Sequence, residues 1–438
     1  MSEFNQLKND KDNRQQTMSF PLELLRQAQE QNWASMARST LDENPFYRKK
    51  FADVDLKSVT LDRFDQLPLT TKSELMGDGE FAANLTHAPD EYTRFHRTSG
   101  TSGKPMIVLD TAEDWQNWIE GWQYVLDAAD VGPSDRAVLA FSFGPFIGFW
   151  TAFDAAIARG LMVVPTGALS TTARLELIRS IDATVVFCTP SYALHMAEVA
   201  NQTGIDLTQT AVKKIIVAGE PGGSVPAIRS KIESAWGATV IDHAGASEVG
   251  PWGFPDEGNK GLFVNESMCF AEVVSLEDQS VIARSELPDL ADAEDGPLAE
   301  LVLTTLNRNG CPVVRYRTGD LVRPCNYPDV GFLFLRGGVL GRTDDMMIIR
   351  GVNVFPSSIE QIIRAFPDVA EYRLTAFQSG EMDQLKIEIE SSKDLTKELT
   401  EQLQTRLGLR IDVEAVEPDT LPRFEAKGRR FVDRRKQS

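Results

Sequence analysis

Five short apolar runs follow one another through the middle of the chain, separated by intervals long enough for a helix. They span residues 137–141, 161–165, 184–188, 214–218 and 239–241, and Gly, Pro or polar residues bound each of them. Almost wholly apolar runs are typical of strands buried on both faces, and the intervals suit crossover helices. The pattern predicts a parallel sheet within an α/β layer structure.

The hydrophobic pattern changes on both sides of this region. Residues 1–60 are polar and helical in character. Their scattered apolar anchors are Leu22, Leu24, Leu25 and Trp33. On the other side, runs at 270–274, 300–305 and 332–335 lie between acidic or Gly-rich loops, which predicts a small antiparallel β subdomain.

The chain beyond Gly341 has a third pattern, in which strand-like and helix-like segments alternate before a basic tail. These segments are residues 346–349, 357–365, 385–389 and 395–407. We expect a compact α+β lobe here. The predicted domains are residues 1–343, a large N-terminal α/β lobe with the β subdomain, and residues 344–438, a small C-terminal lobe.

The composition narrows the function classes. The 438 residues are 42% hydrophobic, enough for a large core and more than one lobe. The formal net charge of −19 opposes nonspecific binding to nucleic acids or anionic membranes. The N-terminus is polar, and no stretch approaches the ~18 apolar residues of a membrane span. We expect a soluble, cytoplasmic protein with no nucleic-acid partner and no membrane association.

A loop rich in glycine and hydroxyl groups, residues 97–105 (RTSGTSGKP), precedes a strand-like segment. Backbone N–H groups, hydroxyls and a lysine together offer a nest for a phosphate chain. The loop is not a Walker A motif, because its glycines stand too close together and Pro105 follows the lysine. A surface hairpin has the same composition, so both interpretations stay open for this segment alone.

Three further motifs carry charged residues in turns. Residues 242–250 (DHAGASEVG) come directly off the last predicted parallel strand, where ligands of α/β sheets bind, and Glu248 could hold Mg²⁺ against phosphate oxygens. Residues 316–321 (YRTGDL) and 341–356 (GRTDDMMIIRGVNVFP) combine aspartates in Gly turns with arginines, which suits ribose hydroxyls and phosphates. Taken singly, each motif is also typical of a plain turn with a surface salt bridge.

The order and spacing of these four segments resemble the adenylate-forming superfamily of acyl-CoA synthetases, luciferases and peptide adenylation domains. Within it, the chain is most similar to the branch of phenylacetate–CoA ligases and coenzyme F390 synthetases. Further matches are residues 188–192 (CTPSY), 218–221 (AGEP), 350–356 (RGVNVFP) and 421–428 (LPRFEAKG). The resemblance runs from about residue 20 to the end of the chain.

The resemblance implies a role for each matched residue in binding ATP and Mg²⁺. Glu248 would bind Mg²⁺, Asp320 the ribose hydroxyls, and Arg342 the same sugar and the phosphates. Thr98 would grip the β- and γ-phosphates together with Ser99, Gly100, Thr101, Ser102, Gly103 and Lys104. The rest of the nucleotide site would comprise Gly219, Glu220, Pro221, Asp242, His243, Ala244, Gly245 and Ser247.

The same resemblance implies that the C-terminal lobe takes part in catalysis. Lys427 would bridge the attacking carboxylate and the α-phosphate, although a solvated lysine is the alternative that its basic setting suggests. Asp344 would be a hinge that rotates the lobe between the two half-reactions. The thiol of coenzyme A would then approach past Arg350, Gly351 and Asn353.

The carboxylic acid would lie against an aromatic wall. By similarity, this wall would comprise Phe141, Phe143, Phe146, Ile147, Ala218 and Gly245. An aromatic slot suits an aryl or arylacetic acid, although an aromatic run beside a helix is equally typical of a core.

The chain departs from the branch in two ways. Ala244 stands where the family usually places a tyrosine that stacks on adenine, so His243 or another aromatic would have to replace it. Several relatives also carry a cysteine cluster for structural zinc. The four cysteines here include no CxxC pair, and we predict no zinc.

The leading hypothesis is ATP-dependent activation of a carboxylic acid as its adenylate, followed by transfer to coenzyme A. A close alternative delivers the acyl group to a carrier-protein pantetheine or an amine, and a third transfers AMP to a cofactor hydroxyl. A catalytically silent binding protein is the remaining alternative, against which the joint presence of Lys427, Glu248 and Asp320 argues. We expect a homodimer, because homodimers are common in the branch.

Overall fold

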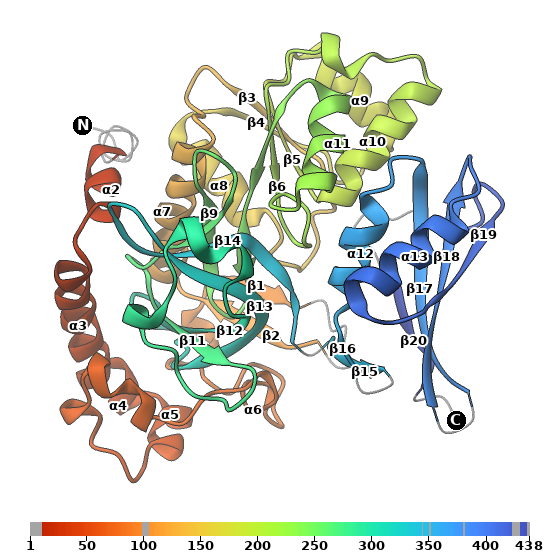
Figure 1. Ribbon diagram of the computed structural model, residues 1–438. Helices are drawn as coiled ribbons and strands as arrows, with labels where there is room; N and C mark the ends of the chain where they lie inside the picture. Colours follow the sequence, from red (N-terminus) through yellow and green to blue (C-terminus); the bar gives the residue numbers. More distant parts are fainter. Residues whose placement is uncertain are drawn as a thin grey trace.

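The structure is a computed structural model that describes residues 11–98, 105–343, 345–349, 352–379, 382–422 and 430–435. A large lobe carries a parallel and an antiparallel sheet, and a smaller lobe formed by the C-terminal part of the chain lies beside it (Figure 1). The expected α/β class with a small α+β C-terminal lobe is confirmed. The boundary between residues 343 and 344 stays a proposal, since residue 344 lies outside the described residues.

All five apolar runs in the middle of the chain are strands of one parallel sheet, in the order β4-β3-β5-β6-β7. Their bounds are β3 Arg136–Leu139, β4 Met162–Pro165, β5 Val185–Cys188, β6 Lys214–Val217 and β7 Thr239–Asp242. This part of the prediction is confirmed. A parallel sheet places the carboxyl ends of its strands along one edge, where the motifs after β6 and β7 begin.

Helices cover both faces of this sheet (Figure 1). On one face lie α9 Thr171–Ser180, α10 Pro190–Gln202 and α11 Pro226–Trp236, and on the other α7 Ala112–Ala128 and α8 Trp150–Arg159. Successive strand residues point to opposite faces. Val138 and Ile215 therefore pack in the core beneath α9, α10 and α11. Leu139 and Ile216 pack in the core on the other face, beneath α7 and α8.

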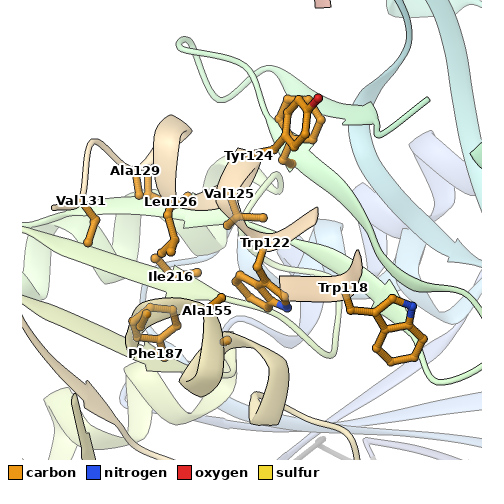
Figure 2. Close-up of a cluster of buried hydrophobic side chains, with 14 of the residues drawn as sticks. Trp118, Trp122, Tyr124, Val125, Leu126, Ala129, Val131, Ala155, Phe187 and Ile216 are labelled. Atoms are coloured by element: carbon orange, nitrogen blue, oxygen red, sulfur yellow. The ribbon is translucent and has the colours of Figure 1, made fainter. Parts of the chain in front are cut away.

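The core between the sheet and α7 is unusually aromatic (Figure 2). Trp118 and Trp122 of α7 are fully buried, and Trp122 packs near Phe187 of β5. The Trp122 indole N–H donates to Thr151 Oγ1 of α8 at 2.9 Å, so its polar atom is satisfied. This packing fixes α7 beneath the edge where the site motifs emerge.

A seven-stranded antiparallel sheet follows, in the order β11-β12-β13-β14-β10-β9-β8. Its strands are β8 Ala244–Ala246, β9 Gly250–Pro255, β10 Gly261–Val264, β11 Cys269–Ser275, β12 Ala299–Thr305, β13 Tyr316–Tyr327 and β14 Val330–Arg342. The three expected runs lie in β11, β12 and β14. A separate hairpin, β1 Arg94–Arg97 and β2 Ile107–Asp110, flanks the glycine-rich loop.

The N-terminal segment is helical, as expected. Its helices are α2 Lys11–Met18, α3 Leu22–Arg38, α4 Thr40–Glu43, α5 Pro45–Lys50 and α6 Lys72–Met76. Leu25 and Trp33 are buried, but Leu22 and Leu24 are 37% and 49% exposed, so their prediction as anchors was wrong. The helical period explains this, because Leu25, Gln29 and Trp33 share the buried face of α3.

The C-terminal lobe has its own core and a four-stranded sheet in the order β19-β18-β17-β20. Its elements are β15 Met347–Ile349, β16 Val352–Val354, α12 Pro356–Arg364, β17 Val369–Ser379, β18 Met382–Ser391, α13 Thr396–Leu407, β19 Asp412–Val416 and β20 Phe431–Asp433. Among the described residues, none of the helices has the length and apolar character needed to span a bilayer.

Candidate active site

Glu248 lies in the turn of the β8–β9 hairpin, which continues from the carboxyl end of β7. Its side chain is only 6% exposed. Oε1 of Glu248 pairs with Nζ of Lys72 at 2.9 Å, an ion pair between segments far apart in the sequence. A buried carboxylate with a cation beside it is suited to contact phosphates and their counterion.

Lys72 is a site residue that the sequence analysis missed. The backbone of Thr70 holds its segment against β13, since Thr70 N donates to Arg315 O at 2.8 Å and Arg317 N donates to Thr70 O at 2.9 Å. Thr71 and Glu74 then form a capping box that starts α6 at Lys72. The capping signal was visible in the sequence, but nothing local indicated that Glu248 would be the partner.

Asp320 and Arg342 face each other across β13 and β14, where they are register partners. Nη1 of Arg342 donates to Asp320 Oδ1 at 3.0 Å and to the Thr318 carbonyl at 2.6 Å. Gly319 has a φ of +73°, and a Cβ atom there would lie 2.4 Å from Arg342 Nη2. Only glycine therefore lets the guanidinium lie across this turn.

Tyr316 connects the two charged motifs. It precedes Asp320 by four residues on β13, and a register shift with a left-handed Gly319 lies between the two. Burial, and next the Glu248 carboxylate, raise the pKa of Tyr316 well above its ordinary value, while Arg342 opposes them and Asp320 adds to them. The structure thus brings Glu248, Asp320 and Arg342 together around one phenol.

Arg308 is a second residue that the sequence analysis missed. It is fully buried, its Nε and Nη2 donate to Asp110 Oδ1 at 2.9 and 2.6 Å, and its Nη1 donates to the Glu248 carbonyl at 2.5 Å. The guanidinium also stacks 4.8 Å from the Trp118 ring. Arg308 therefore ties the hairpin beside the glycine-rich loop to the turn that carries Glu248.

Asp242 ends β7 and is buried behind the glycine-rich turn after β6. Its Oδ2 accepts from Ser224 Oγ at 2.5 Å, and a Cβ atom at Gly223 would lie 2.5 Å from its Oδ1. Burial raises the pKa of Asp242 to about 6, although the Ser224 hydrogen bond opposes that change. The Asp242 carboxyl group is therefore held in place by a short hydrogen bond at the carboxyl end of the sheet.

His243 is packed inside the large lobe and is 6% exposed. Its ring centroid is 4.1 Å from that of Trp122, and its Nδ1 lies 2.7 Å from the Gly253 carbonyl. Ala244 is half-buried and lies opposite Gly253 on β9. Trp122 packs on the His243 ring, and a contact of His243 with adenine stays a prediction.

A cavity of about 180 Å³ lies between the lobes. Glu220, Pro221 and Arg342 line it from the large lobe, while Glu360 and Arg364 line it from the small lobe. The Glu220 carboxylate accepts from Ser191 N at 2.7 Å, which fixes the loop after β6. The structure thus brings three predicted nucleotide-site residues to one cavity, and Arg342 joins this cavity to the group around Tyr316.

The aromatic segment after β3 is partly enclosed. Phe141 and Phe143 are half-buried with ring centroids 4.5 Å apart, and both pack with Ile147 and Ala218 against the Trp122 core. Phe146 differs from the rest because it is 49% exposed. Gly245 is exposed and Ser247 half-buried in the neighbouring hairpin. The segment contributes both to the core and to the surface above it.

Several predicted residues lie outside the described part of the chain. They are Ser99, Gly100, Thr101, Ser102, Gly103, Lys104, Asp344, Arg350, Gly351 and Lys427, while Asn353 is described only by its backbone in β16. Thr98, which borders the loop, is buried, and its Oγ1 accepts from Met106 N at 3.0 Å. This bond closes the β1–β2 hairpin immediately before the glycine-rich loop.

The described residues include no group of three or more His, Cys, Asp or Glu side chains that could hold a metal ion. Cys188, Cys269, Cys311 and Cys325 are buried and unpaired. Among the described residues, Glu248 offers a single carboxylate, and Mg²⁺ commonly takes one or two protein carboxylates together with substrate oxygens. The absence of zinc stays a prediction that metal analysis of the purified protein tests.

Comparison with known proteins covers nearly the whole chain. Residues 351–435 match the AMP-binding enzyme C-terminal domain. The chain is 34% identical to the phenylacetate–coenzyme A ligase of Escherichia coli K12, over 89% of this chain and 90% of that one. It is 31% identical to that of Aromatoleum evansii, over 91% and 92% of the two chains.

Solved structures show the same fold. The post-adenylation structure of a 2-hydroxyisobutyryl-CoA ligase, in complex with its acyl adenylate, aligns at a TM-score of 0.86 and 24% identity, covering 96% of this chain and 92% of that one. The thioesterification structure of that ligase aligns at only 0.70, with 25% identity and the same coverage. The whole chain therefore superposes better on the post-adenylation structure. With relatives above 30% identity along nine-tenths of both sequences, the chain belongs to the phenylacetate–coenzyme A ligase family of adenylate-forming enzymes.

Proposed function

We propose that this protein is an AMP-forming acid–coenzyme A ligase. In the first half-reaction, a carboxylate oxygen attacks the α-phosphorus of ATP and pyrophosphate leaves. In the second, the thiol sulfur of coenzyme A attacks the acyl carbonyl carbon and AMP leaves. The observation that carries the proposal is the 34% identity to a phenylacetate–coenzyme A ligase through both lobes.

The charged groups around Tyr316 suit the nucleotide in this reaction. Asp320 would accept the ribose hydroxyls, and Arg342, held across Gly319, would lie beside the same sugar and the phosphates. Charge-assisted hydrogen bonds from a pre-positioned guanidinium need no reorganisation when charge develops at phosphorus. Glu220 and Pro221 would bound the nucleotide where the lobes meet.

Glu248 would hold Mg²⁺ together with oxygens of ATP. The single buried carboxylate fits this ion, which takes one or two protein carboxylates and completes its shell with phosphate oxygens and water. When bound, the ion would neutralise phosphate charge. The Lys72 ammonium, which forms an ion pair with Glu248 in this structure, would supply a second positive charge near the phosphates.

The remaining assignments rest on the resemblance. Thr98 and residues 99–104 would bind the phosphates, Lys427 would bridge the carboxylate and the α-phosphate, and Asp344 would act as the hinge. After rotation, residues 350, 351 and 353 would line the path of the thiol. By the same resemblance we propose a homodimer, which analytical ultracentrifugation tests.

The acid proposed by similarity is aromatic. The relatives in Escherichia coli and Aromatoleum evansii are phenylacetate–coenzyme A ligases, and Phe141 and Phe143 offer ring surfaces beside Ala218. Ring packing supplies much of the affinity in such slots.

Pyrophosphate release across a panel of carboxylic acids, with and without coenzyme A, tests the proposal. We expect release with at least one arylacetic acid and acyl-CoA formation when coenzyme A is added. Release with no acid would overturn the enzyme assignment. Release without acyl-CoA formation would instead favour a carrier-protein or amine acceptor, and AMP found on a cofactor hydroxyl would favour the third alternative.

A further inference from the structure

We propose that His243 is a specificity-determining residue whose Nε2 atom accepts a hydrogen bond from a hydroxyl or N–H group on the substrate acid. The inference deepens the proposed function and rests on it, because it places the acyl group beside Gly245. It narrows the substrate class from an aromatic acid to an acid that carries a hydrogen-bond donor away from its carboxylate.

The tautomer of His243 follows from its contacts. Nδ1 lies 2.7 Å from the carbonyl oxygen of Gly253, which can only accept. Nδ1 must therefore carry a proton and donate it. Burial lowers the pKa of His243 to about 4, so the ring is neutral at ordinary pH and its single proton sits on Nδ1. Nε2 is consequently a bare acceptor.

The position of Nε2 links it to the surface of the site. A Cβ atom built on Gly245 would lie 3.3 Å from Nε2. Gly245 itself is exposed, so this atom lies directly behind a residue without a side chain. Any side chain at position 245 would cover Nε2, whereas glycine leaves the approach to it open.

The surroundings of the ring are aromatic and connect to the proposed acyl wall. The His243 ring packs 4.1 Å from Trp122, whose ring centroid is 6.3 Å from that of Phe149, and Phe149 in turn packs 4.9 Å from Phe141. His243 therefore places one polar atom, Nε2, at the end of an otherwise aromatic row of side chains. The contact with Trp122 covers part of the ring, while Nε2 lies on the side of Gly245.

The chemistry of Nε2 determines what it can recognise. A neutral acceptor repels carboxylate and carbonyl oxygens, so it cannot hold the reacting carboxyl group. An apolar acid would cover Nε2 without a partner, at the cost of an unsatisfied acceptor. We expect an acid with a well-placed donor to be preferred by roughly 10- to 100-fold over the same acid without it.

Matched pairs of acids provide the test. Phenylacetate is compared with its three ring-hydroxylated isomers, and isobutyrate with 2-hydroxyisobutyrate, by kcat/KM for pyrophosphate release. His243→Asn keeps a donor for the Gly253 carbonyl but removes the distal acceptor, while His243→Gln places a carbonyl oxygen near the Nε2 position. The melting temperature of each variant verifies that it is folded.

We expect the unaltered protein to prefer one hydroxylated acid over its unsubstituted partner. The ratio of the two kcat/KM values should fall toward 1 in His243→Asn and should partly recover in His243→Gln. Equal preference in the protein and both variants, or no preference in any pair, would overturn the inference. A rise in KM for ATP with every acid would also overturn it, because Nε2 would then contact the nucleotide.

Binding of the same pairs separates this inference from the proposed function. Calorimetry with a nonhydrolysable ATP analogue measures affinity without turnover. If no acid supports pyrophosphate release but the donor-bearing acid still binds more tightly and loses that advantage in His243→Asn, the inference stands while the ligase assignment fails. Equal affinities within every pair would sink the inference, whatever the activity.

Discussion

Asp242 and His243 are neighbours whose pKa values move in opposite directions for the same reason. Burial disfavours the charged form of each group, so the pKa of Asp242 rises to about 6 and that of His243 falls to about 4. Both side chains are therefore largely neutral when the protein is mildly acidic. These two neutral groups can recognise polar partners by hydrogen-bond geometry rather than by charge.

The low pKa of His243 predicts a pH-dependent stability. Between pH 6.5 and 4 the unfolded chain binds a proton at His243 that the folded chain does not, so this residue lowers stability as the pH falls through that window. In His243→Asn this contribution disappears, while that of Asp242 is retained. We expect the unfolding free energy of the unaltered protein relative to the variant to drop by about 3 kcal/mol from pH 6.5 to 4. Thermal melting across this range measures the difference, and a constant difference would contradict it.

Lys427 carries a prediction about one half-reaction only. If its ammonium stabilises the charge that develops as the carboxylate meets the α-phosphate, Lys427→Ala should lower adenylation by roughly 100- to 1,000-fold. Thioester formation from supplied acyl adenylate should change far less, because after the proposed rotation of the lobe Lys427 would no longer lie at the reacting carboxyl group. ATP–pyrophosphate exchange and acyl-CoA formation measure the two steps. Lys436→Ala, a control in the same basic tail, should retain both, and equal loss of both steps in Lys427→Ala would refute the assigned role.

At the scale of elements, the site depends on where three hairpins meet. The β13–β14 hairpin aligns Asp320 with Arg342, the β8–β9 hairpin presents Glu248, and the β1–β2 hairpin flanks the glycine-rich loop. Arg308 joins the last two through the Asp110 carboxylate and the Glu248 carbonyl. Such a connection couples the stability of these elements to the position of the Glu248 carboxylate.

Arg308→Gln should both destabilise the protein and disturb nucleotide binding. It leaves the Asp110 carboxylate, which is fully buried, without its charge partner, at a cost of about 3–5 kcal/mol. Because the turn holding Glu248 loses its anchor, we also expect KM for ATP to rise. Arg336→Gln is the control, since Arg336 pairs at 3.5 Å with Glu294, whose side chain is 83% exposed, and donates to the Leu290 carbonyl at 3.1 Å, so its loss should cost only about 1 kcal/mol.

Melting temperature and steady-state kinetics check both effects of Arg308→Gln. Arg308→Lys retains a charge for Asp110 and should recover stability better than it recovers KM, because one ammonium cannot reach all three hydrogen-bond positions. Equal recovery of both quantities would argue that Arg308 acts on stability alone.

At the scale of the whole molecule, the contact between the lobes includes a partly buried lysine. Nζ of Lys231 on α11 donates to the Phe366 carbonyl beyond the end of α12, at 3.3 Å. Burial, and next the charge of Arg364, lower the pKa of Lys231 to about 8. If the C-terminal lobe rotates about the proposed hinge at Asp344, Lys231 would lose this burial.

Linkage then predicts a pH-dependent balance between the two arrangements. With Lys231 exposed, its pKa is close to the ordinary 10.5, so the rotated arrangement binds a proton between pH 8 and 10.5 that the observed one does not. Raising the pH through this window should favour the observed arrangement. Small-angle scattering or interlobe fluorescence transfer from pH 7 to 10 measures the shift. Lys231→Met should remove it, Lys397→Met on the exposed face of α13 should not, and a shift unchanged in Lys231→Met would disprove the role of this lysine.

The apolar runs of the amino-acid sequence were sufficient to predict the parallel sheet, all five of its strands and the two-lobed α/β class, because burial on both faces is a local property of each strand. The order of the motifs was likewise sufficient for the family and for the candidate residues Glu248, Asp320 and Arg342. Leu22 and Leu24 show where local pattern fails, since exposure depends on which face of α3 meets the sheet.

Tertiary structure alone decided the partners of these residues. Lys72 reaches Glu248, Arg308 reaches both Asp110 and Glu248, and the pairing partners lie tens to hundreds of positions away. Trp122 and the Gly253 carbonyl together determine the tautomer and the charge of His243, which no sequence motif encodes. Hydrogen bonds, desolvation and ion pairs depend on distance in space. Chain order therefore identified which groups this protein carries, and folding determined what each of them contacts.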